Sequence, residues 1–475
     1  MNRAMHFGAA AAFLLGGAFL TGAAAQTTDD VIDELESALL DQAGDVSPKQ
    51  LRKDLKHLEP LTDADFPAPN AAKEELGKLL FFDKVLSGNM NISCATCHHP
   101  LTATGDGLSL SIGEGGRGLG VIRDTGTADD AVHERVPRNA PPVFMLGHKD
   151  FTVMFHDGRV SGDAVNGFVS PAGSDLPSGL DNALAVQAMF PVTSGTEMAG
   201  QGGENDIADH GADLPAIWES LAQRLRDIPE YVDLFKAAYS DVNNANDITY
   251  VHAANAIAAF EGTAWRADNS PFDQWLRGDN RAMTRDALRG AKLFYGKANC
   301  ASCHSGVLQT DLDFHAIGIP QIGPGKGDNA PGFSDGHDDF GRERVTGNPE
   351  DRCRFRTPTL RNVALTGPWG HDGAYDSLEA VVRHHLDPIR SLYYYEAGQM
   401  VLPSRTDLDA IDLTVFSSDD RMYALASTCE ITPVSLSDDE VAQVIEFLRA
   451  LTDPTQIDLR RNVPKSVPSG LPMFE

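Results

Sequence analysis

The clearest periodic pattern in the chain lies in EELGKLLFFDKVLSG, residues 74–88. The residues that recur at the three- and four-residue spacing of one helix face are Leu76, Leu79, Leu80 and Asp83. Gly88 follows them as a residue type that commonly ends a helix. The pattern therefore predicts a helix just before the cysteine-containing stretch SCATCHHP, which begins at Ser93.

A second copy of this arrangement stands in ALRGAKLFYGKANC, residues 287–300. When Gly77 is aligned with Gly290, the apolar residues that follow each glycine coincide. Cys94 follows Gly77 by 17 residues, and Cys300 follows Gly290 by 10. The repeat indicates an internal duplication of a helix, a loop and a cysteine unit. The 206 residues between the two first cysteines are about one domain's length.

Each half also ends in a predicted helix. In SLSDDEVAQVIEFLRALTDP, Ser437 and Glu440 form a capping box, and Pro454 follows the apolar stripe. The segment DITYVHAANAIAAFEGTAW, residues 247–265, takes the same place in the first half. Strand-like alternation is scarce, so the predicted fold class is mainly α.

The segment between the halves is polar and rich in turn-forming residues. We therefore place a linker at residues 266–285, between an N-terminal domain at 26–265 and a C-terminal domain at 286–475. Long stretches rich in Gly, Asp and Pro, without a sustained period, lie at 101–140, 198–215 and 318–352. Loops of such length are usually functional or mobile.

The length and the first residues bound the class of protein. A chain of 475 residues, 42% hydrophobic and 23% charged, is long enough for two or more packed domains. Residues 1–25 combine Arg3, an apolar run and a small-residue ending before Gln26, which predicts a cleaved signal peptide and export to the periplasm. The apolar run is shorter than the roughly 20 residues of a membrane helix. No membrane span is therefore expected after processing.

The net charge of -29 restricts the partners. A negative field repels nucleic acid and anionic membranes, and it attracts cationic partners such as a basic electron carrier. Solubility alone is the alternative explanation of the charge. Six cysteines in an exported protein would ordinarily suggest disulfides, but four of the six fall in two CxxCH units.

The two CxxCH units are Cys94, Cys97 and His98 in the first half and Cys300, Cys303 and His304 in the second. In this motif the two thiols add to the vinyl groups of a haem, and the histidine is an axial ligand of the iron. The alternatives are a zinc site, which needs four N or S ligands at suitable spacing, and a disulfide within each CxxC. Two copies, each after a similar helix in an exported chain, favour two covalently bound c-type haems.

Further motifs then become interpretable. They are RNAPP at 138–142, FHDGRV at 155–160, SPFDQWLRGD at 270–279 and FRTPTLRNVALTGPWGHDGAYDSLEAVV at 355–382. Together with the segments around both CxxCH units, they resemble the bacterial di-haem cytochrome c peroxidase family, which includes the MauG-type enzymes. The resemblance runs from about Glu74 to Asp453. It implies two cytochrome c-like haem domains in tandem.

The resemblance implies different roles for the two haems. The N-terminal haem cleaves peroxide and the C-terminal haem receives or stores electrons, with His98 and His304 as proximal ligands. The family's peroxide pocket holds a Gln, a Pro in some members and a Glu, and VQAMFPVTSGTEMAG supplies Gln187, Pro191 and Glu197. Cleavage of the O–O bond needs a proton moved from the inner to the outer oxygen, which a nearby carboxylate can accept and return. Gln187 would hold peroxide or water.

On the other side of the second haem iron, family members place a Met or a Tyr, in the helix after HDG and SLE. Matching by position puts His385 there, in DSLEAVVRHHLDP. This implies a bis-histidine haem with a lower potential than Met ligation would give. His384, on a different helical face, and Met400 are the alternative ligands, and a core or surface histidine is the alternative explanation of His385.

Two positions depart from the family's pattern. Members usually have a Trp before DGR, between the haems, where this chain has His156. The other indoles that could share charge between the haems are Trp265, Trp275 and Trp369. In many members a loop histidine caps the peroxidatic iron until reduction releases it, and His133 is the candidate here. Without that bond the first haem is open at rest, as in the MauG-type branch.

A calcium ion between the domains is common in the family, held by an Asn side chain and backbone carbonyls, which are hard oxygen ligands. Asn139 matches the Asn, and the segment beginning at Thr357 would supply carbonyls. A turn residue bonded to its own backbone is the alternative for Asn139. Cys353 and Cys429 lie outside the CxxCH units, and they form either a disulfide or two buried thiols.

These inferences predict a periplasmic di-haem c-type peroxidase-like oxidoreductase. It would reduce hydrogen peroxide with electrons from a small redox protein, a cytochrome c or a cupredoxin. One alternative is a MauG-type oxidase, in which a side chain of a partner protein supplies the electrons and is itself modified. The other is a purely electron-transferring di-haem cytochrome. The oligomeric state is open, with a homodimer as one possibility.

Overall fold

The fold, seen in a computed structural model, is built mainly from helices. The structure describes residues 45–127 and 131–473, so the predicted signal peptide at 1–25 lies outside the described residues. The helices of the first half are α2 (Pro48–Asp54), α3 (Ala71–Phe82), α4 (Cys94–Cys97), α5 (Ala183–Gln187), α6 (Leu214–Arg226), α7 (Pro229–Ala238) and α8 (Tyr250–Ala264). Those that follow are α9 (Pro271–Leu276), α10 (Arg285–Phe294), α11 (Glu343–Thr346), α12 (Leu378–Leu386), α13 (Pro388–Tyr393), α14 (Thr406–Asp412), α15 (Asp419–Thr428) and α16 (Asp438–Ala450).

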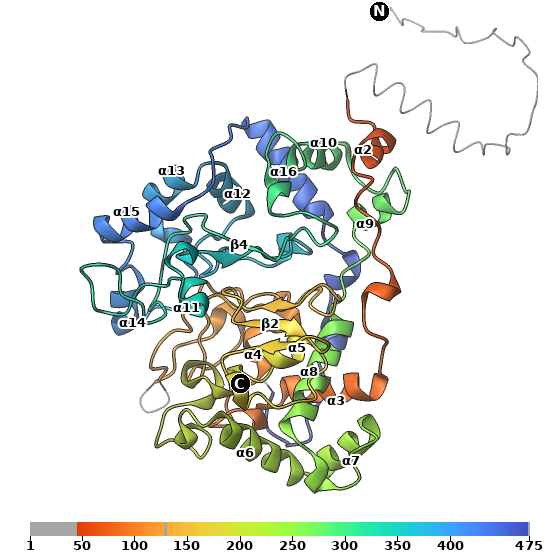
Figure 1. Cartoon of the computed structure of the whole chain (residues 1–475), viewed down its shortest axis with the longest axis vertical. Helices are drawn as coiled ribbons and strands as arrows, with labels where there is room; N and C mark the ends of the chain where they lie inside the picture. Colours follow the sequence, from red (N-terminus) through yellow and green to blue (C-terminus); the bar gives the residue numbers. More distant parts are fainter. Residues whose placement is uncertain (1–44, 128–130, 474–475) are drawn as a thin grey trace, which may run out of the picture.

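Strand is confined to two small antiparallel sheets among the described residues. The first sheet contains β1 (Val153–Met154), β2 (Val160–Asp163) and β3 (Gly167–Val169), and the second contains β4 (Phe314–His315) and β5 (Phe355–Arg356). In Figure 1, α3 to α8 lie in the lower part of the molecule and α10 to α16 in the upper part.

Two helix pairs have the same close contact. The helix α3 packs against α8, and α10 packs against α16. A Cβ atom on Gly77 would lie 1.8 Å from the carbonyl oxygen of Ala256, and one on Gly290 would lie 1.8 Å from that of Gln443. Only glycine lets two backbones approach this closely. The two glycines that coincide in the sequence alignment therefore have the same role in two equivalent helix pairs.

The prediction that Gly88 ends the first helix is wrong. The helix α3 ends at Phe82, because the carboxylate of Asp83 accepts a hydrogen bond from the backbone N–H of Val85, 3.0 Å away, and starts a new turn. Gly88 is instead a contact point, since a Cβ atom there would lie 1.8 Å from the carbonyl oxygen of Ala199.

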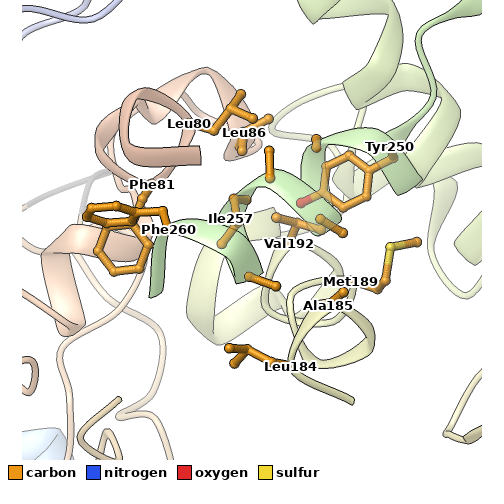
Figure 2. Close-up of a cluster of buried hydrophobic side chains, with 14 of the residues drawn as sticks. Leu80, Phe81, Leu86, Leu184, Ala185, Met189, Val192, Tyr250, Ile257 and Phe260 are labelled. Atoms are coloured by element: carbon orange, nitrogen blue, oxygen red, sulfur yellow. The ribbon is translucent and has the colours of Figure 1, made fainter. Parts of the chain in front are cut away.

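The first hydrophobic core gathers side chains of α3, α5 and α8. Figure 2 shows Leu80 and Phe81 of α3 beside Ile257 and Phe260 of α8, and all four are buried. A fully buried side chain of this size contributes about 1.5–3 kcal/mol. This packing holds α3 in place before the first CxxCH unit.

The second core surrounds α10 and α16 and includes part of the predicted linker. Phe272 and Trp275 of α9 are fully buried in it. Part of the predicted linker at 266–285 is therefore packed in a core. The polar residues around these two aromatics concealed the short helix.

The chain crosses between the two cores near both ends of the described range. Leu51 of α2 and Leu55, which caps the end of that helix, pack in the second core, although they precede the first CxxCH unit. Leu459 and Val467 pack in the first core, although they follow the second unit. The domain division at 266–285 stays a prediction, and it does not separate the cores cleanly.

Candidate functional site

The first CxxCH unit forms a single turn. Helix α4 runs from Cys94 to Cys97, and His98 follows as its last capping residue. The Nδ1 atom of His98 lies 3.2 Å from the carbonyl oxygen of Thr104, and the carbonyl of Pro141 also lies near the imidazole ring. Because a carbonyl only accepts, Nδ1 carries the proton and Nε2 keeps its lone pair. Burial lowers the pKa of His98, so the ring is neutral, which is the metal-binding form.

The second unit repeats these contacts. The Nδ1 atom of His304 lies 3.0 Å from the carbonyl oxygen of Gln309, and the carbonyl of Pro358 also lies near the imidazole ring. Burial, with a contribution from His385, lowers the pKa of His304 to about 4. Its ring is therefore also neutral at pH 7, with the proton on Nδ1 and a free Nε2.

The ring of His385, on α12, faces that of His304. The two ring centroids are 6.1 Å apart, and the planes are inclined at 55°. Two metal–nitrogen bonds of about 2 Å and two ring radii of about 1 Å would place the centroids about 6 Å apart. The Nδ1 atom of His385 lies 2.8 Å from the carbonyl oxygen of Val381, which leaves Nε2 free. The residues therefore fit an iron held between two imidazoles.

The neighbouring His384 has no free nitrogen. Its Nδ1 lies 2.8 Å from the hydroxyl of Tyr375, and its Nε2 lies 2.8 Å from the carbonyl oxygen of Ile317. Met400, the other alternative ligand, is half-buried against a third cluster of side chains that includes Tyr375. The hydrogen bonds thus distinguish His385 from His384, which sequence position alone could not do.

The three residues of the expected peroxide pocket lie on successive short turns. Gln187 ends α5, Pro191 begins the 3-10 turn Pro191–Thr193, and Glu197 lies in the π-helical turn Gly195–Ala199. All three side chains are half-buried. Burial and the charges of Asp106 and, to a smaller extent, Glu197 raise the pKa of the Cys97 thiol to about 12. The carboxylate of Glu197 therefore acts electrostatically on the first CxxCH unit.

Lys326 lies close to Glu197 and was missed by the sequence analysis. Burial lowers the pKa of its ammonium, Arg138 and Arg159 lower it further, and the charge of Glu197 acts in the opposite direction. A lysine of the second half therefore shares the electrostatic environment of the first site. No pattern in the sequence points to it, since the Gly-rich loop 318–352 has no period.

His156 joins backbone segments from both halves. Its Nε2 atom lies 3.0 Å from the carbonyl oxygen of Asn139, and its own carbonyl accepts a hydrogen bond of 2.7 Å from the N–H of Arg356. Pro141, whose carbonyl lies near His98, follows Asn139 by two residues. Pro358, whose carbonyl lies near His304, follows Arg356 by two residues. Burial lowers the pKa of His156 to about 4, so its ring is neutral.

The three candidate indoles lie within the hydrophobic cores. Trp265 packs edge-on against Phe81 in the first core. Trp275 stacks on Phe272 in the second. Trp369 is half-buried, and its Nε1 donates to the carbonyl of Val363 at 3.0 Å.

Of the two residues expected to bind calcium, Thr357 does not fit a cation. The carbonyl oxygen of Thr357 already accepts hydrogen bonds from the Thr310 hydroxyl at 2.6 Å and from the Arg356 guanidinium at 3.2 Å. A guanidinium at that distance repels a second positive charge. The side-chain amide of Asn139 donates to the carbonyls of Leu108 and Ser109, at 2.8 and 3.2 Å. These contacts argue against Thr357 as a calcium ligand.

The remaining candidate residues are His133, Cys353 and Cys429. His133 is 55% exposed and pairs with Glu204 at 3.3 Å, which places it at the surface. Cys353 and Cys429 are unbridged thiols, one buried and one half-buried. Burial raises the pKa of Cys353 to about 12, although its thiol is hydrogen-bonded to the side chain of Thr428. In the structure, this pair of cysteines is therefore two thiols without a disulfide.

Comparisons with known proteins agree on one family. A sequence profile described as di-haem cytochrome c peroxidase matches residues 71–281. The methylamine utilization protein MauG of Methylorubrum extorquens is 33% identical over 317 residues, 66% of this chain and 68% of that protein. The cytochrome-c peroxidase IdrP1 of Denitromonas iodatirespirans is 30% identical over 403 residues, 80% of this chain and 88% of that protein.

Solved structures show a similar fold. The crystal structure of a MauG-like protein associated with microbial copper homeostasis is 26% identical, covers 86% of this chain and 96% of its own, and has a TM-score of 0.56. The diheme peroxidase BthA of Burkholderia thailandensis is 20% identical, covers 82% and 88%, and has a TM-score of 0.51. This second likeness is one of fold.

Proposed function

Because the chain belongs to the di-haem cytochrome c peroxidase family, we propose that it reduces hydrogen peroxide at a haem held by His98. Electrons enter through a second haem held by His304 and His385. This assignment rests on one observation, the number of imidazole rings that face each other at each site. His385 faces His304, whereas no described residue places a second imidazole ring against that of His98. Among the described residues, the second site thus offers two histidine ligands and the first site offers one, which supports peroxide binding at the first.

Both groups are proposed to be c-type haems, each bound through the two thiols of one CxxCH unit in one of two tandem domains. When bound, haem supplies an iron that reacts with peroxide and exchanges electrons. The chain's own contribution begins with the carbonyls of Thr104 and Gln309, which fix the protons of His98 and His304 on Nδ1. Each Nε2 is then available as an iron ligand.

Glu197 is proposed to move the proton. It accepts a proton from the inner oxygen of peroxide and returns it to the outer oxygen, which leaves as water. Gln187 donates a side-chain N–H to orient the substrate, and Pro191 shapes the turn between them. The electrostatic effect of Glu197 on the Cys97 thiol supports this role. Calcium has no part in the proposal, because of the contacts at Thr357.

The protein is proposed to act in the periplasm, after removal of residues 1–25. None of the helices in residues 45–127 and 131–473 combines the length and apolar character needed to cross a membrane. The partner is proposed to be a small one-electron redox protein, and the net charge of -29 favours a basic one.

A MauG-type oxidase is the second candidate function. The observation that favours it is the surface position of His133, paired with Glu204. A first haem without this histidine is open at rest and needs no prior reduction.

One experiment tests the proposal and separates the two candidates. Purified holoprotein is mixed with hydrogen peroxide and a reduced small cytochrome c, and oxidation of the cytochrome is followed by stopped-flow absorbance. We expect multiple turnovers and one open, high-spin iron by EPR. Turnover only with a protein that becomes covalently modified would establish the second candidate. Two low-spin irons with no reaction toward peroxide would overturn both.

A further inference from the structure

A line of aromatic rings leads from the second haem site towards the surface. The ring of His385 is 6.0 Å from that of His384, which is 5.1 Å from Tyr375, which is 5.6 Å from Tyr395. Tyr375 and Tyr395 are buried, whereas Tyr394, the residue just before Tyr395 in the chain, is 76% exposed. The spacing between consecutive rings is short enough for electrons to move stepwise along them.

The hydrogen bonds fix the position of each proton at the inner end of this line. The Nε2 atom of His384 donates to the carbonyl of Ile317 at 2.8 Å, so the proton of the ring lies on Nε2. Its Nδ1 therefore accepts from the hydroxyl of Tyr375, at 2.8 Å. The hydroxyl of Ser391 lies 3.0 Å from the same phenolic oxygen and donates to it. The phenol of Tyr375 thus has a base in place for its proton.

A phenol is oxidised far more readily when its proton can leave at the same time, because the cation radical of a phenol is a very strong acid. We propose that Tyr375 is a redox-active relay of the second haem site. This inference rests on the proposed function, in which peroxide oxidises the haems and His385 binds the second iron. It adds a residue that the haem chemistry itself does not require.

The step balances in electrons and protons. After peroxide has oxidised the protein, Tyr375 gives one electron to the second haem site, and its phenolic proton moves along the hydrogen bond to Nδ1 of His384. A neutral tyrosyl radical and a protonated imidazole result. A one-electron donor protein then returns an electron by way of Tyr395, and the proton returns to the phenolic oxygen.

Another buried tyrosine provides a matched control. Tyr239 packs against the ring of His252 at 4.7 Å, but its hydroxyl donates to the backbone carbonyl of that residue, at 2.6 Å. A carbonyl cannot take a proton as an imidazole can. Tyr239 also lies in the first half, where it is the C-cap residue of α7. The two tyrosines are therefore alike in burial and in having a histidine neighbour, and they differ in the proton acceptor.

The test is rapid-freeze EPR of holoprotein mixed with one equivalent of hydrogen peroxide and no reductant. We expect a tyrosyl radical in the parent, identified by the collapse of its hyperfine pattern when ring-deuterated tyrosine is incorporated. Tyr375→Phe should lower the radical yield at least tenfold, with both haem spectra unchanged, and Tyr239→Phe should leave the yield as in the parent.

A second variant keeps the test decisive if Tyr375→Phe fails to fold. Ser391→Ala removes one hydrogen bond to the radical oxygen, which should raise the largest g value of the signal. If the parent's haems react with peroxide but give no tyrosyl radical, the relay is overturned and the proposed function stands. The same holds if the radical is unchanged in Tyr375→Phe, or if its g value is unchanged in Ser391→Ala. A parent whose haem spectrum does not respond to peroxide would overturn the proposed function and the relay with it.

Discussion

The imidazole rings of His304 and His385 face each other with centroids 6.1 Å apart, although 80 residues of chain separate them. Each ring has its Nδ1 atom bound to a backbone carbonyl, of Gln309 and Val381 respectively. The two free Nε2 atoms are therefore positioned by backbone hydrogen bonds of their own elements. The geometry for a bis-histidine iron is part of the fold of the polypeptide.

Replacing His385 with Ala should open the second iron and leave the first unchanged. One of the two nitrogen ligands is lost, so the low-spin signal of that haem should give way to a high-spin signal in EPR. His385→Met is the matched variant, because it restores a sixth ligand and should shift the potential upwards. An unaltered low-spin spectrum in His385→Ala would show that another residue binds the iron.

Glu197→Gln should slow the reaction with peroxide by about 10²- to 10⁴-fold, the usual contribution of an acid-base group. The amide keeps the size of the side chain but cannot accept the proton. The measurement is the stopped-flow rate of the change in the haem spectrum. Glu219→Gln is the control, since Glu219 is 64% exposed and pairs with Arg226 on the surface of α6. If both variants react as fast as the parent, Glu197 is not the acid-base group.

Arg138→Met should destabilise the protein by about 3–5 kcal/mol at neutral pH, the usual effect of removing one partner of a buried ion pair. Arg138 binds Asp157 and Asp339, each at 2.7 Å, and all three side chains are buried. Burial acts to raise the pKa of the two carboxyls, but Arg138 outweighs it and lowers the pKa of Asp157 to about 2 and that of Asp339 as well.

The pH dependence of this variant has a definite sign. In the parent, the folded-state pKa of each carboxyl lies below its unfolded value of about 4, so the stabilisation is present above pH 4 and is lost as the pH falls towards 2. Without Arg138, Asp339 loses its ion pair, so burial acts to raise its pKa and favours the protonated form, whereas Asp157 keeps an ion pair with Arg159. The difference in unfolding free energy between parent and variant should therefore be largest at pH 7 and smaller at pH 4. Arg449→Met, at a surface pair with Glu446, should change stability by less than about 1 kcal/mol at either pH.

Gly77→Ala and Gly290→Ala should each destabilise the protein by at least about 1–3 kcal/mol, because the added methyl meets backbone at 1.8 Å and the helices must separate. Thermal unfolding measures the loss. Gly398→Ala is the control, since nothing lies within 4 Å of the added atom. Equal melting temperatures for Gly77→Ala and the parent would contradict the contact of α3 with α8.

The sequence predicted what depends on local patterns. The mainly helical fold and the equivalence of Gly77 and Gly290 follow from periodicity and alignment. The choice between His384 and His385 could not be settled in this way, because the two residues are adjacent and differ only in the hydrogen bonds that tertiary contacts provide. Lys326 was missed for a related reason, since only the folding of its loop brings it near Glu197. The short helix that buries Trp275 was not predicted, because it lies in a stretch of the chain that is mostly polar.

The crossing of the chain between the two cores bears on the order of assembly. Leu459 and Val467 complete the core that surrounds α3 and α8, yet they are synthesised long after those helices. The half that holds the first CxxCH unit is thus synthesised first, but its core cannot finish packing until the second half has also been synthesised. A haem could be joined to Cys94 and Cys97 while this half is still loosely folded and accessible to the attachment machinery. Late closure of this core would then seal the haem in place.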